Sequence, residues 1–144
     1  EYISRDILEE YKADEVIVEN GGDIFMKLTS PALISVYAGD SPLSEKIALQ
    51  IRPEETPLSV CCSSGTVGHS LSFGIADACT IACRSGALAD AFATAFCNEV
   101  KKKEMVIEVT EHALQMPEIV SVVIIAGDKV GLGGCIEIKL MEKD

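Results

Sequence analysis

Four residues near the start of the chain, Asn20-Gly21-Gly22-Asp23, separate two short apolar runs and restrict the fold more than any other feature. Asn and Gly tolerate positive φ angles, so this tetrapeptide favours a tight turn between two strands. The flanking runs, residues 16–19 and 24–28, have the length and apolar content of strands. We therefore expect the chain to begin its sheet with an antiparallel hairpin.

Further apolar runs follow the hairpin, and the pairs Ser30-Pro31 and Ser41-Pro42 mark breaks between them. Apolar positions at helical spacing predict helices elsewhere. Ser85 has the side chain of a helix N-cap. The run Val106-Ile107-Glu108-Val109 suits a strand as well as a helix. We expect strands over residues 33–37, 46–51, 58–62 and 76–83, and helices over residues 3–11, 85–98 and 104–115.

The end of the chain has two more apolar runs, residues 119–126 and 135–140. We expect them to form a closing hairpin around Gly127-Asp128, with Gly131, Gly133 and Gly134 shaping its turn. Short links between strands imply a largely antiparallel sheet with helices packed on one side, so the predicted class is α+β. The 144 residues suffice for one domain, residues 1–144, and no linker or repeat divides them.

The net charge of the chain limits the classes of partner that it can bind. A net charge of −11 repels phosphate backbones and anionic membranes, so we expect neither nucleic acid nor membrane as a partner. A polyanionic ligand would need a bound cation. No apolar run is long enough to span a bilayer. A cytoplasmic location is expected, although the chain begins at Glu1 rather than Met, which leaves a removed leader open.

Six cysteines, none of them in a Cys-x-x-Cys pair, lie mostly among apolar neighbours. One interpretation is that they are small buried hydrophobic residues in a reducing cytoplasm. Cys61 and Cys62 are adjacent and would point to opposite faces of a strand. The alternative is a thiol or metal–sulfur function.

The Ala-rich helix expected after Ser85 carries Asp90 and Thr94, which lie four residues apart and hence on one face. A carboxylate in small, apolar surroundings is costly unless it is paired or binds a cation. A carboxylate and a hydroxyl together can begin a magnesium site, since Mg²⁺ takes oxygen ligands. The alternative is an exposed Asp and a Thr that bonds back to its own helix.

Two glycine-containing segments could contact a ligand. Gly21 and Gly22 would let the backbone approach a ligand closely, although they also suit a simple turn. The segment Ser63-Ser64-Gly65-Thr66-Val67-Gly68-His69-Ser70 could hold phosphates through backbone amides, or be an ordinary polar loop. His69 is the candidate catalytic residue, because a loop His can act as a general base near neutral pH.

These segments resemble, in this order, the motifs of the ApbE-like superfamily, whose characterised members are FAD:protein FMN transferases. Residues 18–24 resemble its strand, Asn-x-Gly-Gly-Asp and second strand. Ser63-Ser64-Gly65 is similar to its Thr-Ser-Gly, and residues 89–95 match its Ala-Asp-Ala-x-x-Thr-Ala helix. An uncharacterised branch looks closer still, because its Ser-Ser-Gly-Thr-x-Gly-His-Ser loop and Phe-Gly-x-Ala-Asp-Ala segment are intact over residues 63–78.

The resemblance implies a T-fold-like architecture, Mg²⁺, and a flavin nucleotide, FAD or FMN, as cofactors. It carries the family's metal ligands over to Asp90 and Thr94. It also implies that the hairpin and the later loop bind the nucleotide. The residues expected in that role are Asn20, Gly21, Gly22, Asp23, Ser63, Ser64, Gly65 and Thr66.

Three departures qualify what the resemblance implies. His69 is followed by residues 70–74, Ser-Leu-Ser-Phe-Gly, instead of the transferases' Asp-Pro and Thr-Gly. The family's Lys-Gly, and a segment that covers the nucleotide, would precede Glu1. We therefore expect a C-terminal part that pairs with an N-terminal segment or with itself. Its predicted activity is Mg²⁺-dependent FMN transfer or FAD hydrolysis, and the alternative is ligand binding without turnover.

Overall fold

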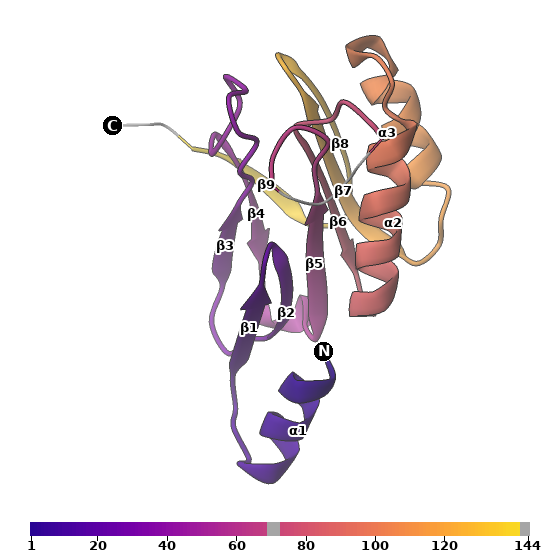
Figure 1. Ribbon diagram of the computed structural model, residues 1–144. Helices are drawn as coiled ribbons and strands as arrows, with labels where there is room; N and C mark the ends of the chain where they lie inside the picture. The colour runs from indigo at the N-terminus through magenta and orange to yellow at the C-terminus, as the bar shows by residue number, and fades with distance from the viewer. Residues whose placement is uncertain (69–72, 142–144) are drawn as a thin grey trace.

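The computed structural model describes residues 1–68 and 73–141 and has the α+β class that the sequence predicts (Figure 1). Its first half contains α1 (Tyr2–Glu10), β1 (Val16–Asn20), β2 (Asp23–Lys27), β3 (Ala32–Ser35), β4 (Ile47–Ile51), the 3₁₀ turn η1 (Pro53–Glu55) and β5 (Leu58–Ser63). Its second half contains β6 (Ala78–Cys83), α2 (Gly86–Glu99), η2 (Lys103–Met105), α3 (Val106–Ala113), β7 (Ile119–Ala126), β8 (Lys129–Gly134) and β9 (Glu137–Leu140).

The strands form two sheets in which every neighbouring pair is antiparallel. The larger has the order β1-β2-β5-β6-β7-β8, and the smaller has the order β3-β4-β9. The first hairpin is confirmed, with Asn20 opposite Asp23. Gly21 and Gly22 take φ angles of 64° and 99°, which L side chains rarely adopt, so the turn depends on both glycines.

Three layers enclose two apolar cores, as Figure 1 shows, with α2 and α3 on one side of the large sheet and the small sheet on the other. Alternation along β5 supplies both cores, because Cys61 faces the helices while Val60 faces the small sheet. All six residues of β6 are buried, as expected for a strand covered on both faces. The sequence predicted a single sheet, whereas the structure has a second sheet as the third layer.

The predicted closing hairpin is wrong in its second strand, although its first strand, β7, and its turn at Gly127-Asp128 are confirmed. Residues 129–134 form a strand, β8, that pairs with β7, and β9 leaves to pair with β4 in the small sheet. The glycines read as a turn, but they make room for α3. A Cβ on Gly131 would lie 2.0 Å from Thr110 Oγ1, and one on Gly133 would lie 2.3 Å from Leu114 Cδ1.

The predicted helices are confirmed, with shifted ends. The third begins as the 3₁₀ turn η2 and ends at Ala113, so its ambiguous Val-Ile-Glu-Val run is helical. Helix α2 buries small side chains against the sheet, including Ala89, Ala93 and Cys97. None of the helices in the described ranges combines the length and apolar content needed to cross a bilayer.

Candidate functional site

A cavity of about 460 Å³ lies where β2 begins, and it collects residues from all three segments that the sequence singled out. The hairpin contributes Gly21, Gly22 and Asp23, the strand end of β5 contributes Ser63 and Ser64, and α2 contributes Asp90 and Thr94. These seven predicted residues come from three segments that are far apart in the sequence. Their convergence is the main evidence that they form one site.

The cavity exists because β5 is longer than its neighbour β2. The last pair between them is Asp23 with Cys61, and β5 continues to Ser63 without a further β2 partner in the described chain. The hairpin turn closes in on this end, since a Cβ on Gly22 would lie 3.8 Å from the Cys62 carbonyl oxygen. Residues from both faces of the large sheet can therefore reach one space.

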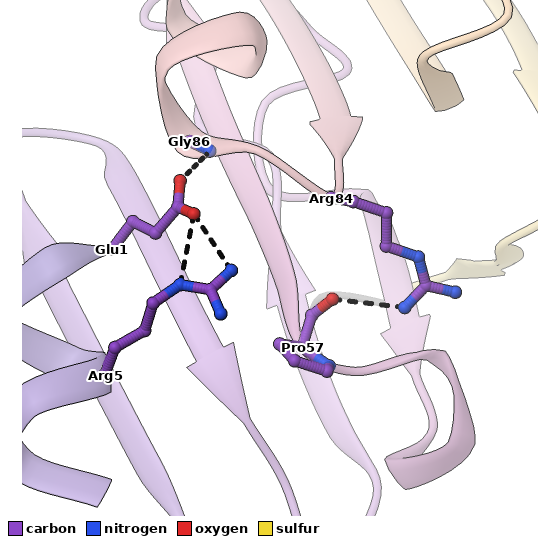
Figure 2. A network of polar contacts seen from close by, with 5 residues as sticks. All are labelled: Glu1, Arg5, Pro57, Arg84 and Gly86. Atoms are coloured by element: carbon purple, nitrogen blue, oxygen red, sulfur yellow. Dashed lines mark hydrogen bonds and ion pairs between the residues drawn. The ribbon is translucent and has the colours of Figure 1, made fainter. Parts of the chain in front are cut away.

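Helix α2 is held in position at its first residue, and Figure 2 shows how. Ser85 is the N-cap residue, as predicted, but its side chain makes no capping hydrogen bond. Instead the Glu1 carboxylate accepts from the Gly86 N–H at 2.8 Å and from the Arg5 guanidinium at 2.9 Å. These bonds, the Gly86 N–H first, lower the pKa of Glu1. An acidic group at a helix N-terminus is stabilising, and this one joins α1 to α2.

A second contact in Figure 2 fixes the approach to the same helix. Arg84, two residues before Gly86, donates from Nη1 to the Pro57 carbonyl oxygen at 3.1 Å. The start of α2 is thus tied to α1 and to the segment before β5. Asp90 stands one turn after Gly86 on this anchored helix.

Two carboxylates crowd the helix side of the cavity. Burial raises the pKa of Asp23, and the charges of Asp90 and Glu19 raise it further, against hydrogen bonds from Cys61 and Cys62 that lower it. Burial, and then Asp23, also raise the pKa of Cys61. The resulting negative region would be stabilised by a cation.

The donor set of this region fits a hard cation. Asp90 and Thr94 offer a carboxylate and a hydroxyl, and Asp23 offers a second carboxylate in the same cavity. None of the described lining residues is Lys, Arg or His. The described chain also has no cluster of three or more His, Cys, Asp or Glu side chains arranged for a metal. Mg²⁺ commonly binds through one or two carboxylates and completes its shell with water and phosphate oxygens.

Three predicted ligand residues lie outside this cavity. Asn20 borders a neighbouring cavity that shares Asp23 and Asp90 with the first. The Gly65 N–H donates to the Ala76 carbonyl oxygen at 2.8 Å, and a Cβ on Gly65 would lie 2.0 Å from the Gly74 carbonyl oxygen. Close backbone packing therefore explains this glycine.

Thr66 has a partner within the protein. Its Oγ1 donates to Asp77 Oδ1 at 2.7 Å, while Asp77 Oδ2 accepts from the Gly127 N–H at 2.6 Å. This pair of bonds ties the loop after β5 to the turn between β7 and β8. His69, the predicted catalytic residue, lies outside the described residues.

The cysteines give no sign of a thiol centre within the described chain. None of the six, all of which lie in the described ranges, forms a disulfide, and Cys135 is exposed. Burial raises the pKa of Cys62 and Cys79, and raises that of Cys83 to about 11. Their thiols therefore stay protonated near neutral pH. Cys62 alone among them lines the main cavity, where it accepts a hydrogen bond from Thr80 Oγ1 at 3.3 Å.

The sequence interpretation missed the cavity wall formed by the end of β3 and the two residues after it. That wall includes Ile34, Ser35, Val36 and Tyr37, which were assigned only to a strand. No local motif marks them, because their proximity to α2 depends on how the two sheets stack.

Comparison with known proteins gives a consistent family. Residues 1–118 match a family model described as AbpE bacteria. A UPF0280 protein of Methanocaldococcus jannaschii is 37% identical over 137 residues, which cover 92% of this chain and 56% of that protein. A UPF0280 protein of Methanothrix thermoacetophila is 42% identical over 122 residues, which cover 85% of this chain and 51% of that protein. A UPF0280 protein of Methanospirillum hungatei is 52% identical over 82 residues, which cover 57% of this chain and 34% of that protein.

The chain spans about half the length of the first two of these relatives. The family model accounts for well over half of the chain and includes the hairpin, the end of β5 and α2. By this match, the chain belongs to the family described as AbpE bacteria.

Proposed function

We propose that the main cavity binds a flavin nucleotide, FAD or FMN, through a Mg²⁺ ion held by Asp90 and Thr94. The observation that carries this proposal is the convergence of Asp90 and Thr94 with Gly21, Gly22, Ser63 and Ser64 on one space. The resemblance of the same three segments to ApbE-like motifs supports the identity of the ligand.

The charges of the cavity support a metal-dependent mode of binding. A nucleotide phosphate would meet Asp23 and Asp90, and none of the described lining residues carries a positive charge. A bound Mg²⁺ would neutralise the charge of these two carboxylates and stabilise negative charge on phosphate oxygens. Asp90 and Thr94 would hold the ion, and the strand end at Ser63 and Ser64 would offer hydroxyl groups to the phosphates.

Two activities are compatible with this site. In one, the protein transfers FMN or hydrolyses FAD. In the other, it binds the nucleotide without turnover. The second is favoured by the departure after His69 and by the chemistry of the described lining, whose only titratable side chains are carboxylates, a thiol and the Tyr37 phenol. Neither alternative changes the assigned metal ligands.

The test is calorimetric titration of the chain with FAD and FMN, with and without Mg²⁺, followed by chromatography of the recovered ligand. We expect binding that depends on Mg²⁺. Recovery of FMN and AMP from FAD would identify an enzyme, whereas intact FAD would identify a binding protein. Binding that is equal with Mg²⁺ and with a chelator would contradict the proposal.

A further inference from the structure

The main cavity has a second side that none of the predicted ligand residues explains. Ile24 and Val60 reach it from the large sheet, and Ile34 and Val36 reach it from the small sheet. All four belong to the core between the two sheets, whereas Asp90 and Thr94 come from α2 on the opposite face. The cavity is therefore divided into an acidic half and an apolar half.

β3 and the two residues that follow it contribute four consecutive residues, Ile34, Ser35, Val36 and Tyr37. Successive side chains of a strand point to opposite faces, so one face would contribute only every second residue. A consecutive run indicates that β3 borders the cavity with its edge. β3 is an edge strand, with β4 on its other side, and the residues of β4 are not among the described lining.

The backbone hydrogen bonds show which polar groups this edge presents. The Val36 N–H donates to the Ile47 carbonyl oxygen at 2.9 Å, so Val36 points its amide toward β4. In an antiparallel pair the residues alternate, and the intervening ones direct N–H and C=O away from the partner. Ser35 and Tyr37 therefore direct these groups to the free edge.

This edge is held firmly. The Val36 carbonyl accepts from the Glu45 N–H at 2.8 Å, and the Ala38 N–H donates to Ser44 Oγ at 2.9 Å. Tyr37 thus sits between two anchored residues. Beyond it Gly39, with φ of 54°, packs so closely that a Cβ would lie 2.7 Å from Val67 Cγ2. The loops after β3 and β5 therefore support each other around the cavity.

We propose that the free edge of β3 at Ser35 and Tyr37 binds the polar edge of a planar heterocycle. Outward N–H and C=O groups would pair with a ring that carries a donor beside an acceptor. The faces of the ring would contact apolar side chains such as Val60. A flavin offers this pattern at its pyrimidine edge, and adenine offers it at its amino-pyrimidine edge. The inference rests on the proposed function, because phosphates held by a metal at Asp90 place the ring of the same ligand in this cavity.

The decisive variant is Ser35→Pro, which removes the outward N–H. Proline is tolerated on edge strands where that N–H faces away from the sheet. The matched control is Leu33→Pro, because Leu33 has the same outward orientation but is not among the described lining residues. Both variants are titrated with FMN, AMP and inorganic pyrophosphate in the presence of Mg²⁺.

We expect Ser35→Pro to weaken binding of one ring-bearing ligand by about tenfold, the size of one lost hydrogen bond in a closed site. Pyrophosphate binding should not change, and Leu33→Pro should behave as the unaltered protein. Loss confined to FMN would assign the edge to the flavin, and loss confined to AMP would assign it to adenine. Equal losses in the two proline variants would overturn the proposal.

Three further results separate this inference from the proposed function. If pyrophosphate binds with Mg²⁺ but FMN and AMP bind no more tightly, the ring subsite is wrong and the metal site stands. If none of the three ligands binds, both are wrong. If Ser35→Pro does not fold, amide hydrogen exchange on the unaltered protein replaces it. The ligand must then slow exchange at Ser35 or Tyr37, and unchanged rates at both would overturn the inference.

Discussion

Asp77 and Asp90 stand in the same tripeptide, Ala-Asp-Ala, yet the fold gives them different surroundings. Asp77 precedes β6, and both of its carboxylate oxygens accept hydrogen bonds, from Thr66 and from Gly127. Asp90 lies on the exposed side of α2 and lines a cavity beside a second carboxylate, Asp23. The first carboxylate completes the protein's own hydrogen bonding, whereas the second lines a cavity.

The same tripeptide therefore does not determine the role of its aspartate. Thr94 shows the same contrast with Thr110 on α3. The Thr110 hydroxyl donates to the Val106 carbonyl of its own helix at 2.7 Å and is buried, whereas Thr94 is exposed and lines the cavity. Exposure beside a cavity, together with a neighbouring carboxylate, distinguishes the candidate metal ligands from residues that serve the fold.

The largest expected effect is on nucleotide binding at Asp90, the aspartate that lines the cavity. Asp90→Asn should weaken Mg²⁺-dependent nucleotide binding by about 100-fold, since loss of groups at a metal site costs on the order of 10–100-fold or more. Stability should change little, because Asp90 is exposed. Calorimetry measures nucleotide binding, and thermal unfolding measures stability. Glu111→Gln, an exposed change on α3, is the control, and equal binding by both variants would refute the assignment.

For Asp77 we expect the opposite, a loss of stability without a loss of nucleotide binding. Asp77→Asn weakens two hydrogen bonds to a carboxylate and should lower the free energy of unfolding by about 1–3 kcal/mol. Nucleotide affinity of the folded protein should stay the same. Urea denaturation and calorimetry on one preparation check both values. If Asp77→Asn lost binding while remaining as stable as the unaltered chain, the division of roles would be wrong.

A smaller effect is expected at the anchor of α2. Glu1→Gln should lower stability by about 0.5–1 kcal/mol near neutral pH, in the range of a helix-cap substitution at a partly solvated position. Because the pKa of Glu1 is lowered in the folded state, its contribution is present above the unfolded pKa, near 4.5, and is lost as pH falls through the folded pKa. Glu9→Gln, an exposed change on α1, is the control for thermal unfolding between pH 3 and pH 7.

The smallest expected effect concerns Asp23. Its pKa is raised in the folded state, so the protonated carboxyl group favours folding below its unfolded pKa, near 3.8, and that contribution is lost as pH rises through the folded pKa. Asp23→Asn should therefore raise stability at pH 7 without Mg²⁺, by less than about 1 kcal/mol because the group is partly solvated. Thermal unfolding at pH 7 measures this gain in stability. If Asp23→Asn is no more stable than the unaltered chain, the carboxylates of the cavity do not repel one another as described.

Much of the fold follows from local signals. The hairpin at Gly21 and Gly22 and the Ala-rich helix α2 are confirmed, because turn chemistry and helix periodicity act over a few residues. The second strand of the closing hairpin was placed wrongly, because Gly131 and Gly133 lie in β8 and pack against α3 rather than forming a turn. Such a requirement depends on a distant helix and leaves no local sign.

The candidate site was predicted in part for a similar reason. The residues with unusual chemistry, Asp90 and Thr94 above all, could be selected from sequence, and the structure brings them together with the hairpin and the end of β5. The edge of β3 could not, because its role depends on strand order and on which backbone groups β4 uses. Thr66 was selected as a hydroxyl in a polar loop, and in the fold it donates to Asp77. Its role toward a ligand stays a prediction.

The expected association with an N-terminal segment, or with a second copy, stays a prediction. Tyr2 and Tyr11 on α1 are 78% and 75% exposed, which leaves an apolar surface beside β1. Sedimentation at micromolar concentration tests self-association of the chain.

The central claim is that Asp90 and Thr94 hold a divalent metal that binds a nucleotide phosphate. The most direct measurement is the anomalous scattering of Mn²⁺, used in place of Mg²⁺, in crystals grown with FAD. The account predicts a single strong peak at coordination distance from the Asp90 carboxylate and the Thr94 hydroxyl, with phosphate density beside it. A peak elsewhere, or FAD bound with no metal between its phosphates and α2, would contradict it.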